Sequence, residues 1–226
     1  MLHNAFAAPL HSSESRDSLA ICSGLIIVCF LLIRMIRGLY PELIVLIPAA
    51  IMIVAASLFV GYLGWYLQSR PETDTRPTVS TETAVLGARL LTVGGVYAIP
   101  VAVAVGITAY TIVSGVRGFL ITLGPTVALL ATVASVYLLP AALHVAATSG
   151  VRPALTRHAV SGLASGSYFF SWVVATTLIV SSWSLQGAIS LSTPAAIIGA
   201  VIIAYTHLVA VQLLSEGLSR SRHSLS

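Results

Sequence analysis

The sequence predicts an all-α fold: a polytopic transmembrane helical bundle of about six spans with proline kinks. Of its 226 residues, 57% are hydrophobic and only 8% are charged, whereas an average soluble domain carries about 25% charged residues. So few charges cannot cover the surface of a water-soluble protein of this length, and we expect lipid to cover most of it. The apolar residues also form long runs, and a membrane-spanning helix needs about 20 such residues.

Six apolar runs follow one another along the chain, separated by short polar connections. We expect spans over about residues 18–35, 43–67, 86–114, 119–146, 163–185 and 188–214. Tyr62, Trp65 and Tyr66 end the second run, as aromatic residues do at a membrane interface. The chain then divides into a short N-terminal tail (1–17), a six-span transmembrane domain (18–214) and a polar C-terminal tail (215–226). The first residues have no basic n-region and no cleavage pattern, so we interpret them as a tail and not as a signal peptide.

The positions of the basic residues predict the orientation. All eleven are Arg, and cytoplasmic connections carry the excess of positive charge. Eight of them share the side of both termini: Arg16, Arg70, Arg76, Arg89, Arg152, Arg157, Arg220 and Arg222. The opposite side holds Arg34, Arg37 and Arg117. We therefore expect a multi-pass protein of the cell membrane with both termini in the cytoplasm. No basic cluster suggests nucleic acid as a partner.

Prolines fall at or inside several spans: Pro48, Pro100, Pro140 and Pro194, with Pro125 also interrupting the fourth span. Inside a helix, a proline removes one hydrogen bond and crowds the carbonyl one turn back. In lipid, neighbouring helices or hydroxyl side chains must satisfy that carbonyl. Two interpretations stay open, namely a hinge or broken-helix binding site, centred on Pro100 and Pro140, and a packed kink.

Few ionisable side chains lie within the spans. No Asp, Glu or Arg lies deep in any of them, which argues against a pump with carboxylate relays. His144 and His207 fall in the cytoplasmic halves of the fourth and sixth spans. They are either a proton-sensitive or metal-touching pair, or two neutral imidazoles bonded to backbone or hydroxyl groups. Two His without a third ligand do not make a metal site, and we expect no cofactor, no catalytic residue and no enzymatic activity.

Small and basic residues before the fifth span suggest contacts with helices and lipid. Gly162 and Gly166 are four residues apart, a spacing that lets two helix backbones approach closely, either within the bundle or between two copies. Arg152 and Arg157 flank Pro153, which is favoured at a first helical position. A short helix over 153–160 would lie in the interface and contact anionic head groups; a solvated loop is the alternative.

Four short segments resemble one known family. They are GGVYAIP at 94–100, GYL at 61–63, VYLLPAAL at 136–143 and GSYFFSW at 166–172. Together they resemble an archaeal membrane-protein family catalogued as domain of unknown function 4013. This resemblance implies a polytopic membrane protein and brings no established activity or catalytic residue. The first and third segments also resemble each other (VYAIP and VYLLP), as in an internal repeat of the kind found in transporters.

These observations leave two functional classes. The first is a structural or accessory membrane component that acts through contacts with lipids, with other membrane proteins or with itself through small-residue helix faces. The second is a small-molecule or lipid transporter whose path follows the proline-broken helices. Missing intramembrane carboxylates favour the first class, while a water-filled cavity reaching Pro100 or His207 would favour the second.

Overall fold

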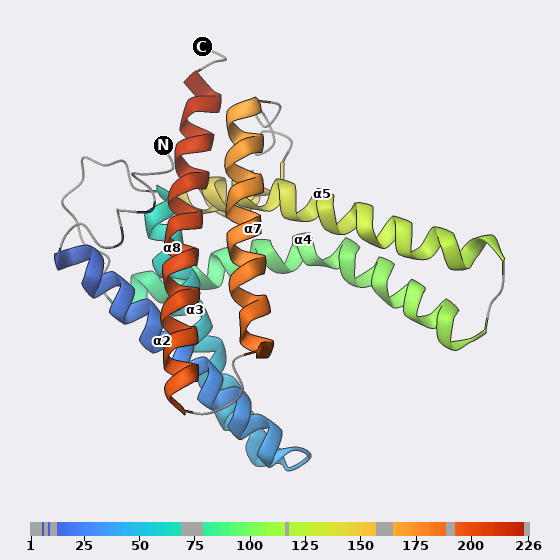
Figure 1. The fold of residues 1–226 in the computed structure, drawn as a ribbon, viewed down its shortest axis with the longest axis horizontal. Helices are drawn as coiled ribbons and strands as arrows, with labels where there is room; N and C mark the ends of the chain where they lie inside the picture. Colours follow the sequence, from blue (N-terminus) through green and yellow to red (C-terminus); the bar gives the residue numbers. More distant parts are fainter. Residues whose placement is uncertain are drawn as a thin grey trace. The chain divides into compact units, whose positions relative to one another are not determined.

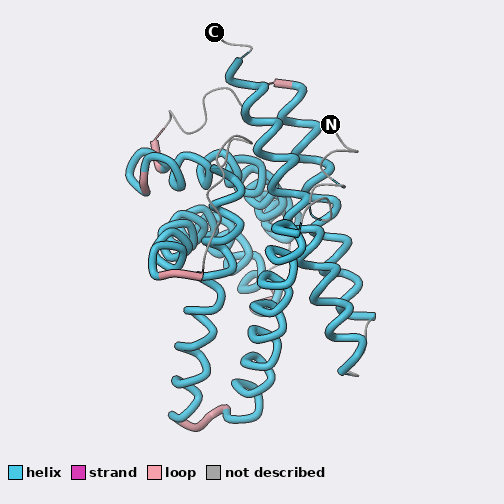
Figure 2. Tube along the Cα trace, turned by 90° about the vertical axis from the view of Figure 1, so that its left-hand side faces the viewer, coloured by secondary structure: helices cyan, strands magenta, loops and turns pink. Residues whose placement is uncertain are grey.

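The computed structural model is helical throughout the part of the chain that it describes. That part comprises Phe6, Pro9 and residues 13–68, 79–115, 118–156, 165–188 and 193–223. The elements are α2 (Ser13–Leu39), the 3₁₀ helix η1 (Leu43–Val45), α3 (Leu46–Gln68), α4 (Thr81–Val113), α5 (Phe119–Ser149), α6 (Val151–Ala154), α7 (Gly166–Ala188) and α8 (Thr193–His223). Figure 1 labels the long helices, and Figure 2 shows that helix makes up nearly all of the described part. The predicted all-α fold is confirmed.

Five of these helices are long and apolar enough to cross a membrane. They cover Ser15–Leu39, Leu43–Gln68, Thr81–Val113, Thr122–Ser149 and Pro194–Ser221. The protein is therefore a multi-pass membrane protein by helix length and hydropathy. At the place of the predicted fifth span lies α7, which is not among the five. Its 23 residues are about 35 Å long at 1.5 Å per residue, long enough to span, and the count of six stays a prediction there.

The chain forms two compact units. The first comprises Met1–Ala88 and Gly162–Ser226, and the second comprises Arg89–Ser161. The first unit holds α2, α3, the start of α4, α7 and α8. The second holds the rest of α4, α5 and α6.

Helix α8 is the centre of the first unit. Half of its apolar span is buried inside the protein, against 22% for α2 and 17% for α3. One core cluster joins Cys22 and Ile26 of α2, Tyr62 of α3, and a face of α8 made by Ala200, Ile203, Ala204 and Leu208. On its other side α8 lies beside α7 (Figure 1), with Val209 and Leu213 packed against Val174 and Leu178.

The last helix extends past the predicted end of the sixth span. It runs to His223, although the span was expected to end at Leu214. The added turns carry Leu218 and Ser221, which are both buried. Packing of the first turns of α7 against Gly217 of α8 explains the extension, because this polar segment gains tertiary contacts as a helix.

Prolines occupy two kinds of position. Pro48 is the third residue of α3 and Pro194 the second of α8, where the backbone N–H has no intrahelical partner to lose. Pro100 lies inside α4, and Pro125 and Pro140 lie inside α5. Both helices continue through them. Among the described residues, the prolines inside helices all belong to the second unit.

In the second unit, α4 and α5 expose many large apolar side chains. Val103, Ile107 and Tyr110 of α4 and Leu129 and Leu130 of α5 are more than half exposed. Near the turn between the two helices, Gly124 of α5 lies against the side chain of Thr108 in α4. Contiguous apolar surface of this extent is covered by lipid or by protein, and not by water.

Candidate functional site

The polar groups inside the first unit gather where α2, α3 and α8 meet. The hydroxyl of Ser18, in the second turn of α2, accepts a hydrogen bond from Tyr62 at 3.2 Å and another from Tyr66. Both tyrosines come from the end of α3, so the two helices run antiparallel and Ser18 joins them. Ser18 and Tyr62 are buried. The two tyrosines predicted to mark a membrane interface therefore also bind a hydroxyl within the bundle.

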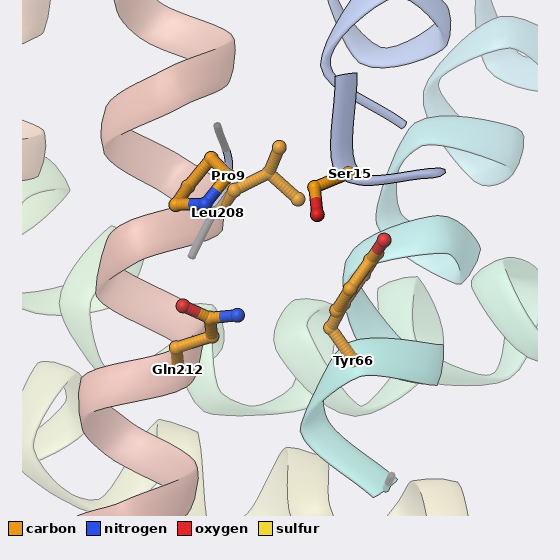
Figure 3. A pocket seen from close by; sticks show the side chains of 5 residues that line it. All are labelled: Pro9, Ser15, Tyr66, Leu208 and Gln212. Atoms are coloured by element: carbon orange, nitrogen blue, oxygen red, sulfur yellow. The ribbon is translucent and has the colours of Figure 1, made fainter. Parts of the chain in front are cut away.

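A small cavity of about 30 Å³ lies next to this cluster. It is lined by Pro9, Ser15, Tyr66, Leu208 and Gln212. Figure 3 shows the hydroxyls of Ser15 and Tyr66 on one side of this space and Gln212 of α8 on the other, with the amide nitrogen of Gln212 on the side of Tyr66 and its oxygen on the side away from it. The amide oxygen Oε1 of Gln212 is buried and has no hydrogen-bond partner. A solute larger than one or two water molecules does not fit this space.

His207 belongs to α8, and its ring contacts Trp183 of α7 and Phe59 of α3. Its Nδ1 is 2.8 Å from the carbonyl oxygen of Ile203, one turn back in α8. Its Nε2 accepts a hydrogen bond from the indole nitrogen of Trp183 at 3.4 Å. Because a carbonyl only accepts and an indole only donates, these two bonds require a neutral imidazole with its proton on Nδ1. Phe59 of α3 contacts the ring edge-on, with centroids 5.7 Å apart.

His144 belongs to the other unit. It lies near the end of α5, half-buried, and its backbone carbonyl accepts a hydrogen bond from the Thr148 hydroxyl at 3.0 Å. The predicted pairing of His144 with His207 stays a prediction. The two hydroxyl residues just before His207 bond elsewhere: Thr206 to the carbonyls of Ile202 and Ile203, and Tyr205 to the carbonyl of Phe6.

Two glycines bring the backbones of α3 and α4 into direct contact. A Cβ added at Gly61 would collide with the carbonyl oxygen of Thr83, and one at Gly87 would collide with that of Ser57. The pairs run antiparallel, Gly61 opposite Thr83 and Ser57 opposite Gly87. Only glycine permits this approach, which is the small-residue packing typical of membrane helices.

A second close contact joins α7 and α8. A Cβ at Gly217 would lie 2.7 Å from the hydroxyl oxygen of Ser171, and Ser171 is only 1% exposed. Its hydroxyl has no hydrogen-bond partner. The contact between Ser171 and Gly217 is therefore one of close packing and not of hydrogen bonding. Of the predicted pair, Gly166 begins α7 and faces open space, while Gly162 lies outside the described residues.

The remaining predicted positions lie apart from this cluster. Pro100 is exposed on α4, and Pro140 is half-buried in α5. Arg152 is exposed in α6, a single helical turn that begins at Val151 and ends at Ala154, with Leu155 and Thr156 in a turn. The short helix was expected over 153–160. It begins at Val151 and ends at Ala154, and residues 157–160 lie outside the described residues. Arg157 lies outside the described residues, and head-group contacts of both arginines stay predictions.

The close contacts and the cavity were not predicted from the sequence. Ser57 and Gly61, Thr83 and Gly87, and Ser167 and Ser171 are each four residues apart, the same spacing as Gly162 and Gly166. The pattern was present but recurs too often in this small-residue-rich chain to single out the pairs in contact. No sequence signal linked Gln212, Ser15 and Tyr66, because they come from three separate helices.

The described residues do not form a metal centre. No group of three or more His, Cys, Asp or Glu side chains within them is placed to hold an ion. Cys22 and Cys29 are both free thiols. Chemically, this region offers neutral hydrogen-bonding groups: the hydroxyls of Ser15, Ser18, Tyr62 and Tyr66, the amide of Gln212 and the neutral imidazole of His207.

Comparisons of this chain with protein-family models, with curated proteins and with solved structures gave no match. The resemblance of four short segments to the family catalogued as domain of unknown function 4013 therefore stays a prediction. Its archaeal origin gains no support from these comparisons.

Proposed function

We propose that the protein is a structural or accessory component of the membrane that acts through contacts of its helices with lipids and with other membrane proteins or a second copy. In this proposal it catalyses no reaction. The observation that carries it is the use of the intramembrane polar groups: Ser18, Tyr62, Tyr66 and His207 all bond one helix to another or to their own backbone.

The outer surface supports the same proposal. Exposed apolar side chains cover α4 and α5, and only 11% of the α4 span is buried within the chain. Such a surface presents a large area to lipid or to the helices of a partner, whereas in the first unit glycine contacts bring α3 close to α4 and α7 close to α8.

The proposal includes both termini on the cytoplasmic side. Besides the Arg distribution, one structural relationship supports it: Ser15 at the start of α2 and Gln212 near the end of α8 line the same cavity. The beginning of the first span and the end of the last therefore lie at the same end of the first unit, as an even number of spans requires.

A transporter is the second candidate, and one observation favours it. Pro100, Pro125 and Pro140 lie inside helices of the second unit, while Pro48 and Pro194 of the first unit lie in first turns. Prolines inside helices of one unit are what a hinge or a path along broken helices needs. The two candidates thus differ in the role of the second unit: in a transporter its helices change conformation, and in a structural component they only pack against lipid or a partner.

Two measurements on the intact protein separate the candidates. The protein is extracted with its surrounding lipid from native membranes, and co-purifying chains and lipids are identified by mass spectrometry. It is also reconstituted into vesicles for solute-uptake assays. We expect one partner chain or lipid class at constant stoichiometry and no uptake above empty vesicles. A solute-specific flux that Pro100→Ala abolishes without unfolding the protein would instead establish the transporter.

A further inference from the structure

We propose that Arg34 and Arg37, in the last turns of α2, bind the head group of an anionic phospholipid of the surrounding membrane. Both side chains are exposed. They are three residues apart, so they lie on one face of the helix with about 5–6 Å between their Cβ atoms. The proposal goes beyond the proposed function and does not depend on it, because a structural component and a transporter can both bind lipid at this place.

The position of the pair along α2 corresponds to the edge of the hydrocarbon layer. Near the start of α2, Ser18 bonds Tyr62 and Tyr66, two of the aromatic residues expected at one interface. Arg37 follows Ser18 by 19 residues, which is about 28 Å along a helix, and the hydrocarbon layer is about 30 Å thick. Arg37 therefore lies close to the head groups of the other interface. Arg34 lies about 4.5 Å deeper, and its long side chain can extend from there to the same level.

The protein itself supplies no counter-charge to this pair within the part of the chain that the structure describes. Neither guanidinium there has a hydrogen bond or an ion pair, and the nearest acidic residue in the sequence, Glu42, is exposed and pairs with neither of them. Two like charges three residues apart destabilise a helix, and an anion bound between them removes that repulsion. The end of a helix favours positive charge, which accounts for Arg37 in the last turn but not for Arg34 one turn earlier.

The surroundings of the pair favour a phospholipid over a free anion. A phosphate suits the chemistry, because guanidinium groups bind it through pairs of N–H donors. Leu31 lies one turn before Arg34 on the same face and is 57% exposed, so it offers apolar surface to an acyl chain. Gly38 lies one turn after Arg34, and a Cβ there would meet nothing within 4 Å, which leaves room for a head group. Apolar surface toward the membrane centre and positive charge toward its edge match the two parts of a phospholipid.

The test measures lipid binding to the intact purified protein by native mass spectrometry. The probes are phosphatidylglycerol, which has a net negative charge, and phosphatidylcholine with the same acyl chains, which has none. We expect the wild type to bind phosphatidylglycerol about tenfold more tightly. The double variant Arg34→Gln, Arg37→Gln keeps polar N–H donors but no charge, and it should lose most of this preference. Equal binding of the two lipids by the wild type would overturn the proposal without any need for a variant to fold.

Two controls distinguish this site from a general attraction of anionic lipid to arginine. The double variant Arg89→Gln, Arg220→Gln removes the same number of charges from α4 and α8, and it should keep the preference of the wild type. An equal loss in both double variants would overturn the site. The second control adds an excess of inorganic phosphate, which should not displace bound phosphatidylglycerol. Displacement would overturn the assignment to a lipid, because it would show that the arginines recognise the anion alone.

Discussion

The indole nitrogen of Trp183 in α7 donates a hydrogen bond to Nε2 of His207 in α8, with 3.4 Å between the two atoms. The same imidazole uses Nδ1 toward the carbonyl of Ile203 at 2.8 Å. His207 therefore links two helices only while its ring is neutral. A proton on Nε2 would place two donors against each other and break the link to α7.

The link between Trp183 and His207 predicts a measurable coupling. Trp183→Phe removes the donor, His207→Phe removes the acceptor, and the double variant removes both. Measured by thermal or denaturant unfolding in one detergent, the double-mutant cycle should give a coupling free energy of about 0.5–1.5 kcal/mol. Trp172→Phe, elsewhere in α7, paired with His207→Phe serves as the control cycle. A coupling of zero between Trp183 and His207 would contradict the bond.

The combined variant His144→Gln, His207→Gln tests whether the histidines are structural. Glutamine keeps a donor and an acceptor but does not titrate, so it can reproduce a neutral imidazole's bonds. We expect the variant to insert and fold. Loss of a co-purified metal, or of a measured flux, would assign these histidines a chemical role instead.

The glycine contacts between α3 and α4 predict strong position dependence along one helix. Gly87→Ala places a Cβ on the backbone carbonyl of Ser57, so one helix must move, and we expect a loss of about 1–3 kcal/mol of stability or more. Gly94→Ala and Gly95→Ala are the matched controls in α4, since nothing lies within 4 Å of a Cβ at either position. They should be neutral or raise stability, by about 0.5–1 kcal/mol. Equal effects at all three positions would contradict the contact.

The apolar runs predicted most of the fold because a membrane-spanning helix needs a long apolar segment. Both the length and the apolar character of a segment can be seen directly in the sequence. α3, α4 and α5 begin and end within a few residues of their predicted spans. The errors lie where tertiary contacts decide: α8 continues to His223, and in its added turns Leu218 and Ser221 are buried and Gly217 lies against Ser171 of α7.

The candidate site was less accessible to sequence reasoning. His207 was selected as an intramembrane ionisable residue, but its partner Trp183 was expected only as part of the fifth span. The position of Gln212 beside a cavity was not predicted, because an amide near the end of a span is common. Only the structure shows that Ser15 and Tyr66 of two other helices line the same cavity. Pairings between helices depend on rotation and crossing, which the apolar runs leave open.

Single cysteines predict which side each connection occupies. In a background lacking Cys22 and Cys29, both free thiols, a membrane-impermeant reagent added outside should label thiols placed at Gly38 or Gly187. It should not label a thiol at Thr75 until the membrane is permeabilised, because the Arg bias assigns that connection to the cytoplasm. Strong labelling of Thr75 in intact cells would reverse the orientation, and labelling of Gly187 and Thr75 on one side would show that α7 does not span.

The last prediction concerns Pro100. It lies inside α4, where the missing N–H leaves the carbonyl of Val96 without its usual helical partner, and it is exposed. Alanine restores that N–H and fits without contacting another helix, so Pro100→Ala should insert, fold and keep a stability equal to or above that of the wild type. Pro140→Ala is the comparison, because Pro140 is half-buried and its replacement alters packing within α5 and its neighbours. Unfolding midpoints and binding of the co-purifying partner or lipid should be unchanged for Pro100→Ala if Pro100 affects packing alone. Loss of a measured function in a folded Pro100→Ala protein would mean that Pro100 takes part in a conformational change, and would favour the transporter over the structural component.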